Sequence, residues 1–83
     1  MAPQELEKSA SKYAAAAIRA DSQGAAGMAI TDYQNASETL LKLIRLYPTS
    51  SLNKIYKQSY QKYQERIQAL RDSNGGNIAP AVD

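Results

Sequence analysis

The chain has 83 residues, with ten lysine or arginine and eight aspartate or glutamate side chains, and it contains neither cysteine nor histidine. This length allows at most one small domain, and the lack of cysteine excludes disulfides and thiolate metal sites. The formal net charge of +2 is too small to make nucleic acid the expected partner. Because no catalytic acid, base or nucleophile pair shares a face, we expect a binding domain that is not an enzyme and that holds no metal or other cofactor.

The sequence also gives expectations about location. Its longest apolar stretch is far shorter than the roughly 20 residues that span a bilayer, and its first residues lack the basic and apolar regions of a secretory signal. We therefore expect a soluble, cytoplasmic protein that does not insert directly into a membrane.

A first helix is predicted over residues 4–22. Pro3 is tolerated at a helix start because its missing N–H has no intrahelical partner there. Gly24 can adopt the left-handed conformation that commonly ends a helix. Between them, apolar residues recur at helical spacing and predict one buried stripe. This stripe consists of Leu6, Ala10, Tyr13, Ala17 and Ala20.

A second helix is predicted over residues 25–47. Pro48 ends it, because proline disfavours helical geometry in the preceding residue and cannot continue the hydrogen-bond ladder. The same apolar spacing runs through the segment and predicts a second core stripe. Its members are Ala29, Tyr33, Ala36, Leu40, Leu43 or Ile44, and Tyr47.

A third helix is predicted over residues 51–72, with Thr49, Ser50 or Ser51 as its N-terminal cap. Residues 73–83 are rich in glycine and polar residues without apolar periodicity, and they predict a flexible linker or tail with a further region attached downstream. The core stripe of the third helix is Leu52, Tyr56, Ser59 or Tyr60, Tyr63, Ile67 and Leu70.

These elements predict an all-α fold, a three-helix antiparallel bundle over residues 1–72. Two short links make neighbouring helices antiparallel, so the first and third helices run parallel to each other. Each has a second stripe beside its core stripe, and we expect the two stripes to meet with small residues opposite small ones and Ile18 near Lys62 and Tyr63. A shallow groove would remain between them.

This groove is the candidate binding site. The alternative interpretation is that apolar residues such as Ile18 and Ile55 only widen the core face. Asp21 and Arg66 are candidates for a structural cap or ion pair. The residues assigned to the groove are Ser11, Ala14, Ile18, Ser59, Lys62, Tyr63 and Arg66.

Several short patterns resemble the MIT (microtubule-interacting and trafficking) domain over about residues 5–72. They are Ala17-x-x-x-Asp21-x-x-Gly24, Ala29-Ile30-x-x-Tyr33-x-x-Ala36 and Tyr63-x-x-Arg66-x-x-x-Leu70, and Leu46-Tyr47-Pro48-x-Ser50 resembles archaeal members at the N-terminus of a cell-division AAA ATPase of the vacuolar-protein-sorting class.

The resemblance implies a recruitment domain that binds C-terminal tails of ESCRT-III-like filament subunits and becomes oligomeric only through the ATPase region. The family takes helical motifs between the second and third helices and extended, proline-containing motifs between the first and third. Gln64 and Gln68 stand where binders of the helical motif have leucine and an acidic residue, which favours the extended mode. The resemblance also implies recruitment to membrane-associated filaments. Alternatives are an MIT domain of another effector, such as a calpain-like protease, and a tetratricopeptide-like module.

Overall fold

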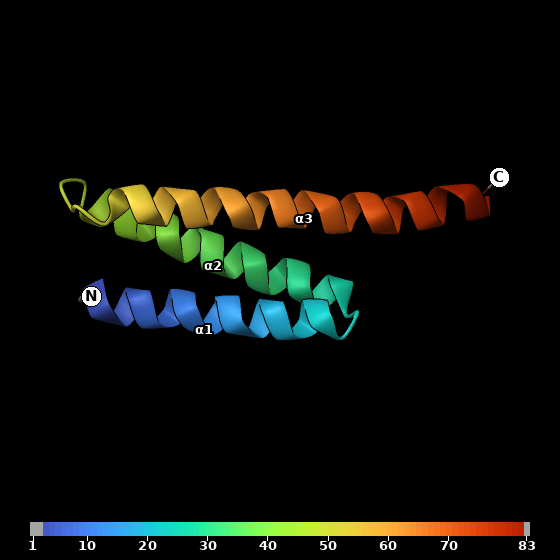
Figure 1. The fold of residues 1–83 in the computed structure, drawn as a ribbon, viewed down its shortest axis with the longest axis horizontal. Coiled ribbons are helices and arrows are strands. Elements are labelled where there is room, and N and C mark those ends of the chain that lie inside the picture. The colour runs from blue at the N-terminus through green and yellow to red at the C-terminus, as the bar shows by residue number, and fades with distance from the viewer. Residues whose placement is uncertain (1–2, 83) are drawn as a thin grey trace.

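A computed structural model describes the backbone of residues 3–82 and the side chains of residues 3–73. Three α-helices follow one another: α1 (Pro3–Ser22), α2 (Ala26–Leu46) and α3 (Asn53–Val82). Figure 1 shows α1 and α3 running in the same direction and α2 running back between them. The predicted all-α bundle, with antiparallel neighbours and parallel first and third helices, is confirmed.

The turn between α1 and α2 is built as the sequence predicts. Gly24 has a φ of 77°, in the left-handed region that glycine adopts without steric cost. The Ala25 amide donates to the Ala20 carbonyl at 2.9 Å, and the Gly24 amide donates to the Asp21 carbonyl at 3.1 Å. These two bonds form a Schellman motif, which satisfies carbonyls that the helix end would otherwise leave unpaired.

The buried face of α1 differs from the predicted stripe at one position. Ala14 is buried, whereas Tyr13 is 39% exposed. Both residues lie close to the stripe on a helical wheel, and the small side chain takes the inner place because it lets the helices approach closely. The buried residues of α1 are Leu6, Ala10, Ala14, Ala17 and Ala20.

The core stripe of α2 is confirmed, with Leu43 rather than Ile44 as its buried member near the C-terminus. Tyr47 lies just beyond the helix and packs, partly buried, against the core. The helix also buries Ser37, which the sequence did not indicate. The buried residues of α2 are Ala29, Tyr33, Ala36, Ser37, Leu40 and Leu43.

Both ends of α3 differ from the prediction. The helix begins at Asn53, after a turn in which the Leu52 amide donates to Ser50 Oγ at 3.2 Å and Asn53 Nδ2 donates to the Tyr47 carbonyl at 2.8 Å. Leu52 is therefore exposed in the loop and does not belong to the core.

At its other end α3 continues to Val82, past the helix end that the sequence predicted at residue 72. Apolar periodicity stops near residue 72, but a helix continues as long as its own backbone hydrogen bonds form. The helix extends past the other two helices, beyond the residue where its apolar periodicity stops (Figure 1). Asp83 lies outside the described residues.

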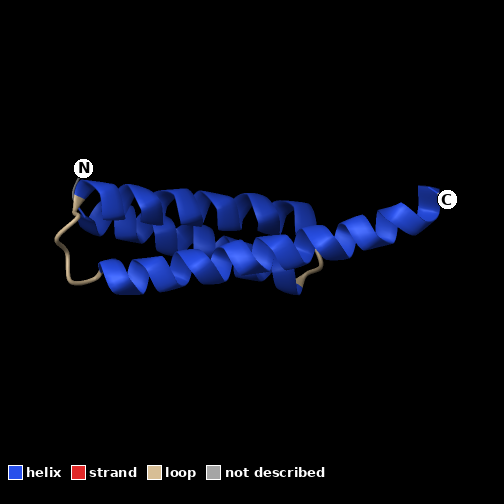
Figure 2. Cartoon of the chain, turned by 90° about the horizontal axis from the view of Figure 1, so that it is seen from above, coloured by secondary structure: helices blue, strands red, loops and turns tan. Residues whose placement is uncertain are grey.

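The spacing of α1 and α3 corrects a further expectation. Among the described residues, no Cα atom of α1 lies within 8 Å of one in α3. The two stripes therefore do not meet with small residues in direct contact, because α2 lies between the helices and large side chains such as Tyr33 and Tyr63 fill the gap. Figure 2, turned by 90°, shows α3 inclined to α1.

Two groups of buried side chains form the core. One joins Leu6 and Ala10 of α1 to Leu40, Leu43 and Tyr56, and the other surrounds Ala17, Ala29, Tyr33 and Ile67. Tyr63 packs against both groups from α3. Within the described range, none of the helices is both long enough and apolar enough to cross a membrane.

Candidate functional site

A groove of about 170 Å³ lies between α1 and α3. Its floor comes from α2, and its two walls come from the sides of α1 and α3 that face each other. We call it the inter-helix groove. It is lined by Glu7, Ala10, Ser11, Leu40, Leu43, Ile55, Tyr56, Ser59 and Tyr63.

Three of the seven predicted site residues line this groove: Ser11, Ser59 and Tyr63. Ser11 is exposed on α1, and Ser59 and Tyr63 are half-buried one helical turn apart on α3. A serine on each wall keeps the side chains short there. The groove therefore stays open between two walls that also offer hydroxyl groups for hydrogen bonds.

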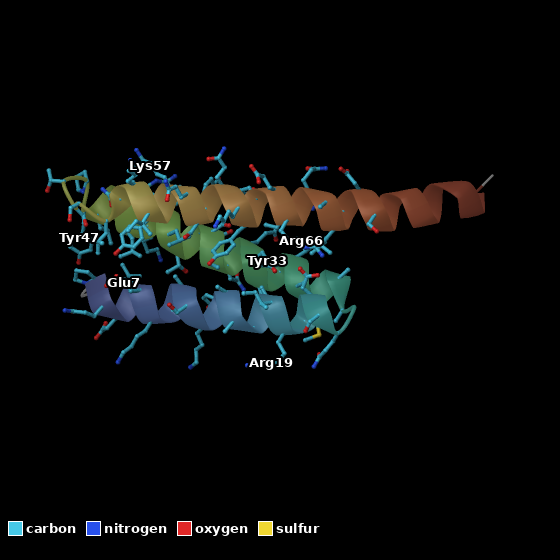
Figure 3. All side chains as sticks on the ribbon, viewed as in Figure 1. Glu7, Arg19, Tyr33, Tyr47, Lys57 and Arg66 are labelled. Atoms are coloured by element: carbon cyan, nitrogen blue, oxygen red, sulfur yellow. The ribbon has the colours of Figure 1, made fainter. Side chains whose placement is uncertain are left out.

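The other four predicted residues are placed differently. Ala14 is buried in the core, and Lys62 is exposed without lining the groove. Ile18 does not line the groove either and is 57% exposed. Arg66 points from α3 toward α1 (Figure 3) and pairs with an acidic residue of the same chain.

That partner is Asp21, the residue for which the sequence suggested a structural role. Arg66 Nε donates to Asp21 Oδ2 and Arg66 Nη2 donates to Asp21 Oδ1, both at 2.7 Å. The Tyr33 hydroxyl donates to Asp21 Oδ2 at 3.0 Å. One carboxylate thus joins side chains of all three helices, and a bidentate pair of this kind fixes orientation as well as distance.

The pKa directions follow from these contacts. The hydrogen bonds from Arg66 lower the pKa of Asp21, against the opposing effect of burial, and the Tyr33 hydroxyl adds to the lowering. The hydrogen bonds to Asp21 raise the pKa of Arg66. Burial, together with the hydrogen bond to Asp21, raises the pKa of Tyr33. Over a wide pH range, Asp21 and Arg66 therefore stay charged and the Tyr33 hydroxyl stays protonated.

A second polar contact joins α1 and α3 within the groove itself. The Tyr56 hydroxyl donates to Glu7 Oε2 at 2.9 Å, and burial raises the pKa of Tyr56 with the help of this bond. Figure 3 shows Glu7 near the start of α1 and Arg66 farther along the bundle. The two cross-helix contacts thus stand at different levels of the space between α1 and α3.

Tyr63 forms the aromatic part of the groove wall and is supported from below. Its ring lies 5.7 Å from the Tyr33 ring, centroid to centroid, with 33° between the planes. Pairs at this separation add stabilisation beyond the area they bury. Because Tyr33 is buried and hydrogen-bonded to Asp21, the Tyr63 ring rests on a fixed neighbour.

Several lining residues were not assigned to the site by the sequence. Ile55 was expected on the side of the third helix that faces the first helix but was left out of the site residues. The apolar floor was assigned to the core, which is correct but incomplete. Nothing in the sequence marked Glu7 as a groove residue. The missed residues are Glu7, Ala10, Leu40, Leu43, Ile55 and Tyr56.

The groove offers apolar surface and hydroxyl groups. In the part of the chain that the structure describes, no three histidine, cysteine, aspartate or glutamate side chains gather in a group able to hold a metal ion. An open, mostly apolar groove with a few polar groups on its walls is suited to binding a peptide segment.

Comparison with known proteins gives one relevant match. No protein-family model matches the chain. Over 53 residues the chain is 47% identical to a protein of Sulfolobus acidocaldarius named Cell division protein C. The match covers 64% of this chain and 14% of that relative, so the chain spans a small part of the protein to which it is similar. The chain and this part of Cell division protein C are homologous.

Proposed function

We propose that the chain is a peptide-binding recruitment domain of a cell-division protein. It docks C-terminal tails of ESCRT-III-like filament subunits in the inter-helix groove and thereby brings an attached AAA ATPase to the filament for remodelling in division or membrane scission. The observation that carries the proposal is the open groove between two parallel helices. The homology to Cell division protein C and the resemblance to MIT domains support the same role.

The groove favours an extended segment as its ligand. Ser11 and Ser59 leave its walls low, and Leu40 and Leu43 give it an apolar floor. Side chains of an extended peptide alternate between two sides, so every second residue would face this floor while the others stay in water. Prolines in the tail reduce the conformational entropy lost on binding, since their backbone is already restricted.

Residues beyond the groove extend this binding surface. Ile18 lies on α1 two turns past Ser11, and its 57% exposure leaves an apolar contact available to a tail that continues along the helix. Lys62 lies between Ser59 and Arg66 on α3 and would favour acidic residues in the tail. Ala14 and Arg66 would contribute indirectly. Ala14 packs in the core beneath the surface, and Arg66 holds α3 to Asp21 of α1.

Binding of one tail should be weak, with a Kd on the order of micromolar, because a linear segment covers less than the roughly 1,600 Å² of a standard interface. Many filament tails and several domains on an oligomeric ATPase would convert weak single contacts into strong attachment. In this arrangement residues 73–83 connect the bundle to the ATPase region, and the ATPase region supplies the oligomer. The protein would then act in the cytoplasm, at filaments on a membrane.

The direct test is a titration of the ¹⁵N-labelled chain with synthetic peptides of ESCRT-III-like tails from the source organism. One set of peptides contains proline and the other set is helical. We expect the proline-containing peptides to shift amide signals of Ser11, Ser59 and Tyr63 in fast exchange. Shifts confined to the outer faces of α2 and α3 would instead indicate binding between those helices.

A matched pair of variants sharpens this test. Ile55→Asp introduces a charge on the groove wall, and Met28→Asp introduces the same charge on α2 at a residue that lines none of the described cavities. Both side chains are more than half exposed, at 55% and 65%, so neither change should unfold the bundle. We expect Ile55→Asp to weaken tail binding at least about tenfold and Met28→Asp to leave it unchanged. Equal affinities for the two variants would exclude the groove as the site.

A further inference from the structure

A second, larger cavity opens at the end of the bundle where α1 begins and the α2–α3 loop turns. Its volume is about 420 Å³, compared with about 170 Å³ for the inter-helix groove. We call it the end pocket. Its apolar lining includes Leu46, Tyr47, Pro48 and Leu52, all from the end of α2 and the loop that follows it.

The end pocket exposes large apolar side chains to solvent. Leu46 is 54% exposed and Leu52 is 41% exposed. Apolar side chains are unfavourable in water, and a ligand that covered these two leucines would remove their apolar surface from water. Leu52 is also the residue that the helical pattern placed in the core and that the loop leaves outside.

The end pocket adjoins the inter-helix groove. Glu7, Leu43 and Tyr56 line both cavities. The hydrogen bond from the Tyr56 hydroxyl to Glu7 Oε2 crosses the junction from α3 to α1. A bound chain that continued from the groove past this bond would reach the end pocket.

The groove alone is short. Its residues on α3 run from Ile55 to Tyr63, which is about 12 Å at 1.5 Å of rise per residue. An extended peptide advances about 3.3 Å per residue, so roughly four residues fill this length. A longer tail must leave the groove at one of its ends, and at the Tyr56 end the next surface that it meets is the end pocket.

We propose that the end pocket is a second subsite for the same filament tail and that it binds a proline or branched aliphatic side chain next to the segment in the groove. The inference rests on the proposed function. Tyr47, Tyr56 and Pro48 supply the aromatic and proline surfaces that favour prolines, as in other sites for proline-containing segments. Glu7, the charged residue of the lining, disfavours an acidic side chain there.

The test is a double-mutant cycle between the end pocket and the tail. The probe is a synthetic proline-containing ESCRT-III-like tail peptide, with a series in which each apolar residue in turn is replaced by serine. The protein variants are Leu52→Ser, Leu46→Ser and the control Met28→Ser, all in the full 83-residue chain. Circular dichroism verifies that helicity is unchanged, since the three side chains are solvent-exposed.

We expect Leu52→Ser and Leu46→Ser each to weaken binding of the full tail about tenfold, and Met28→Ser to have no effect. For one serine-substituted peptide, the affinity for the wild-type chain should be about as low as the affinity of the Leu52→Ser variant for the full tail. That peptide should lose no further affinity with the variant, because both changes remove the same contact. Amide signals of residues 46–52 should shift with the full tail.

Different failures have different meanings. The end pocket is excluded as a subsite if the tail shifts the groove signals while Leu52→Ser and Leu46→Ser bind like the wild type. The proposed function itself fails if no tail peptide shifts the signals of Ser11, Ser59 and Tyr63. If deleting residues 1 and 2, next to Pro3 at the edge of the pocket, raises the affinity and abolishes the effect of Leu52→Ser, the occupant is the N-terminus of the chain and the proposal is wrong.

Discussion

Arg66 of α3 donates two hydrogen bonds of 2.7 Å to the two carboxylate oxygens of Asp21 on α1. The two residues are 45 positions apart in the chain, and within the described structure their helices have no Cα atoms closer than 8 Å. The pair therefore connects two helices whose backbones do not touch. Its bidentate geometry sets both the distance and the angle between them at this level of the bundle.

The first prediction concerns the coupling of this pair. We expect Asp21→Asn and Arg66→Gln each to lower the melting temperature by several degrees. The double variant should melt no lower than the less stable of the two single variants. Either single change removes the ion pair, so the second change has little left to remove. Thermal unfolding followed by circular dichroism measures the cycle.

The control for this cycle is Lys57→Gln, which changes a charge that points away from the bundle on the same helix (Figure 3). It should leave the melting temperature nearly unchanged, as exposed charges contribute little. Strictly additive effects of the Asp21 and Arg66 changes would show that the two side chains do not stabilise the fold as a pair.

The second prediction concerns acid. The hydrogen bonds from Arg66 lower the pKa of folded Asp21 below its ordinary value of 3.8. The unfolded chain therefore takes up this proton first as the pH falls, and the stabilisation from Asp21 is complete above about pH 5 and lost progressively below about pH 4. Urea unfolding between pH 7 and pH 3 should show the wild type losing its advantage over Asp21→Asn. An advantage that stays constant down to pH 3 would contradict the assignment.

The third prediction concerns alkali. Burial raises the pKa of Tyr56 above 10.0, and its hydrogen bond to Glu7 adds to this effect. The unfolded chain therefore releases the proton first, so the contribution of Tyr56 to stability is complete below about pH 10 and is lost as the pH rises through the folded pKa. The stability advantage of wild type over Tyr56→Phe should shrink between pH 9 and pH 11 in urea unfolding. An advantage that grows over this interval would reverse the sign that the contact requires.

The fourth prediction concerns the small side chains between helices. Ala17 is fully buried, so Ala17→Leu should reduce the free energy of unfolding by about 1–3 kcal/mol because the added methyl groups have no space. Ala15→Leu is the matched control, two residues away on the exposed side of α1. Its effect should stay within about 0.5 kcal/mol. Urea unfolding at neutral pH measures the free energy of unfolding of both variants. Equal losses would show that the site of Ala17 is no more tightly packed than the exposed site of Ala15.

The parts of the fold that were predicted correctly have strong local signals. Gly24 and Pro48 mark the ends of two helices, and the apolar stripe of α2 left only the choice between Leu43 and Ile44 open. These signals act within one or two helical turns, so a single sequence contains them in full. The antiparallel order follows because both links are too short for any other arrangement.

The errors concern choices that packing makes. Tyr13 and Ala14 both fit a helical stripe, and only contact with α2 decides which one is buried. Leu52 fits the stripe of α3, yet the turn through Ser50 and Asn53 starts the helix after it. The predicted helix end at residue 72 treated the end of apolar periodicity as the end of the helix.

The candidate site was predicted in outline and not in detail. Helical periodicity identified the sides of α1 and α3 that face each other, and Ser11, Ser59 and Tyr63 of the predicted site line the groove between them. That these residues bind a peptide stays a prediction. Their separation could not be predicted, because it depends on how far the side chains of α2 hold the outer helices apart. Pairing of Asp21 with Arg66 likewise requires contacts between distant parts of the chain.

The distance between the α1 and α3 backbones has a consequence for the range of ligands. Only side chains cross this opening, and side chains change rotamer far more easily than packed helices shift. Under the proposed function, tails of different thickness would enter by displacing side chains of the groove walls while the helices keep their positions. If the groove binds filament tails as proposed, an interface of this kind would tolerate changes in the sequence of the tail.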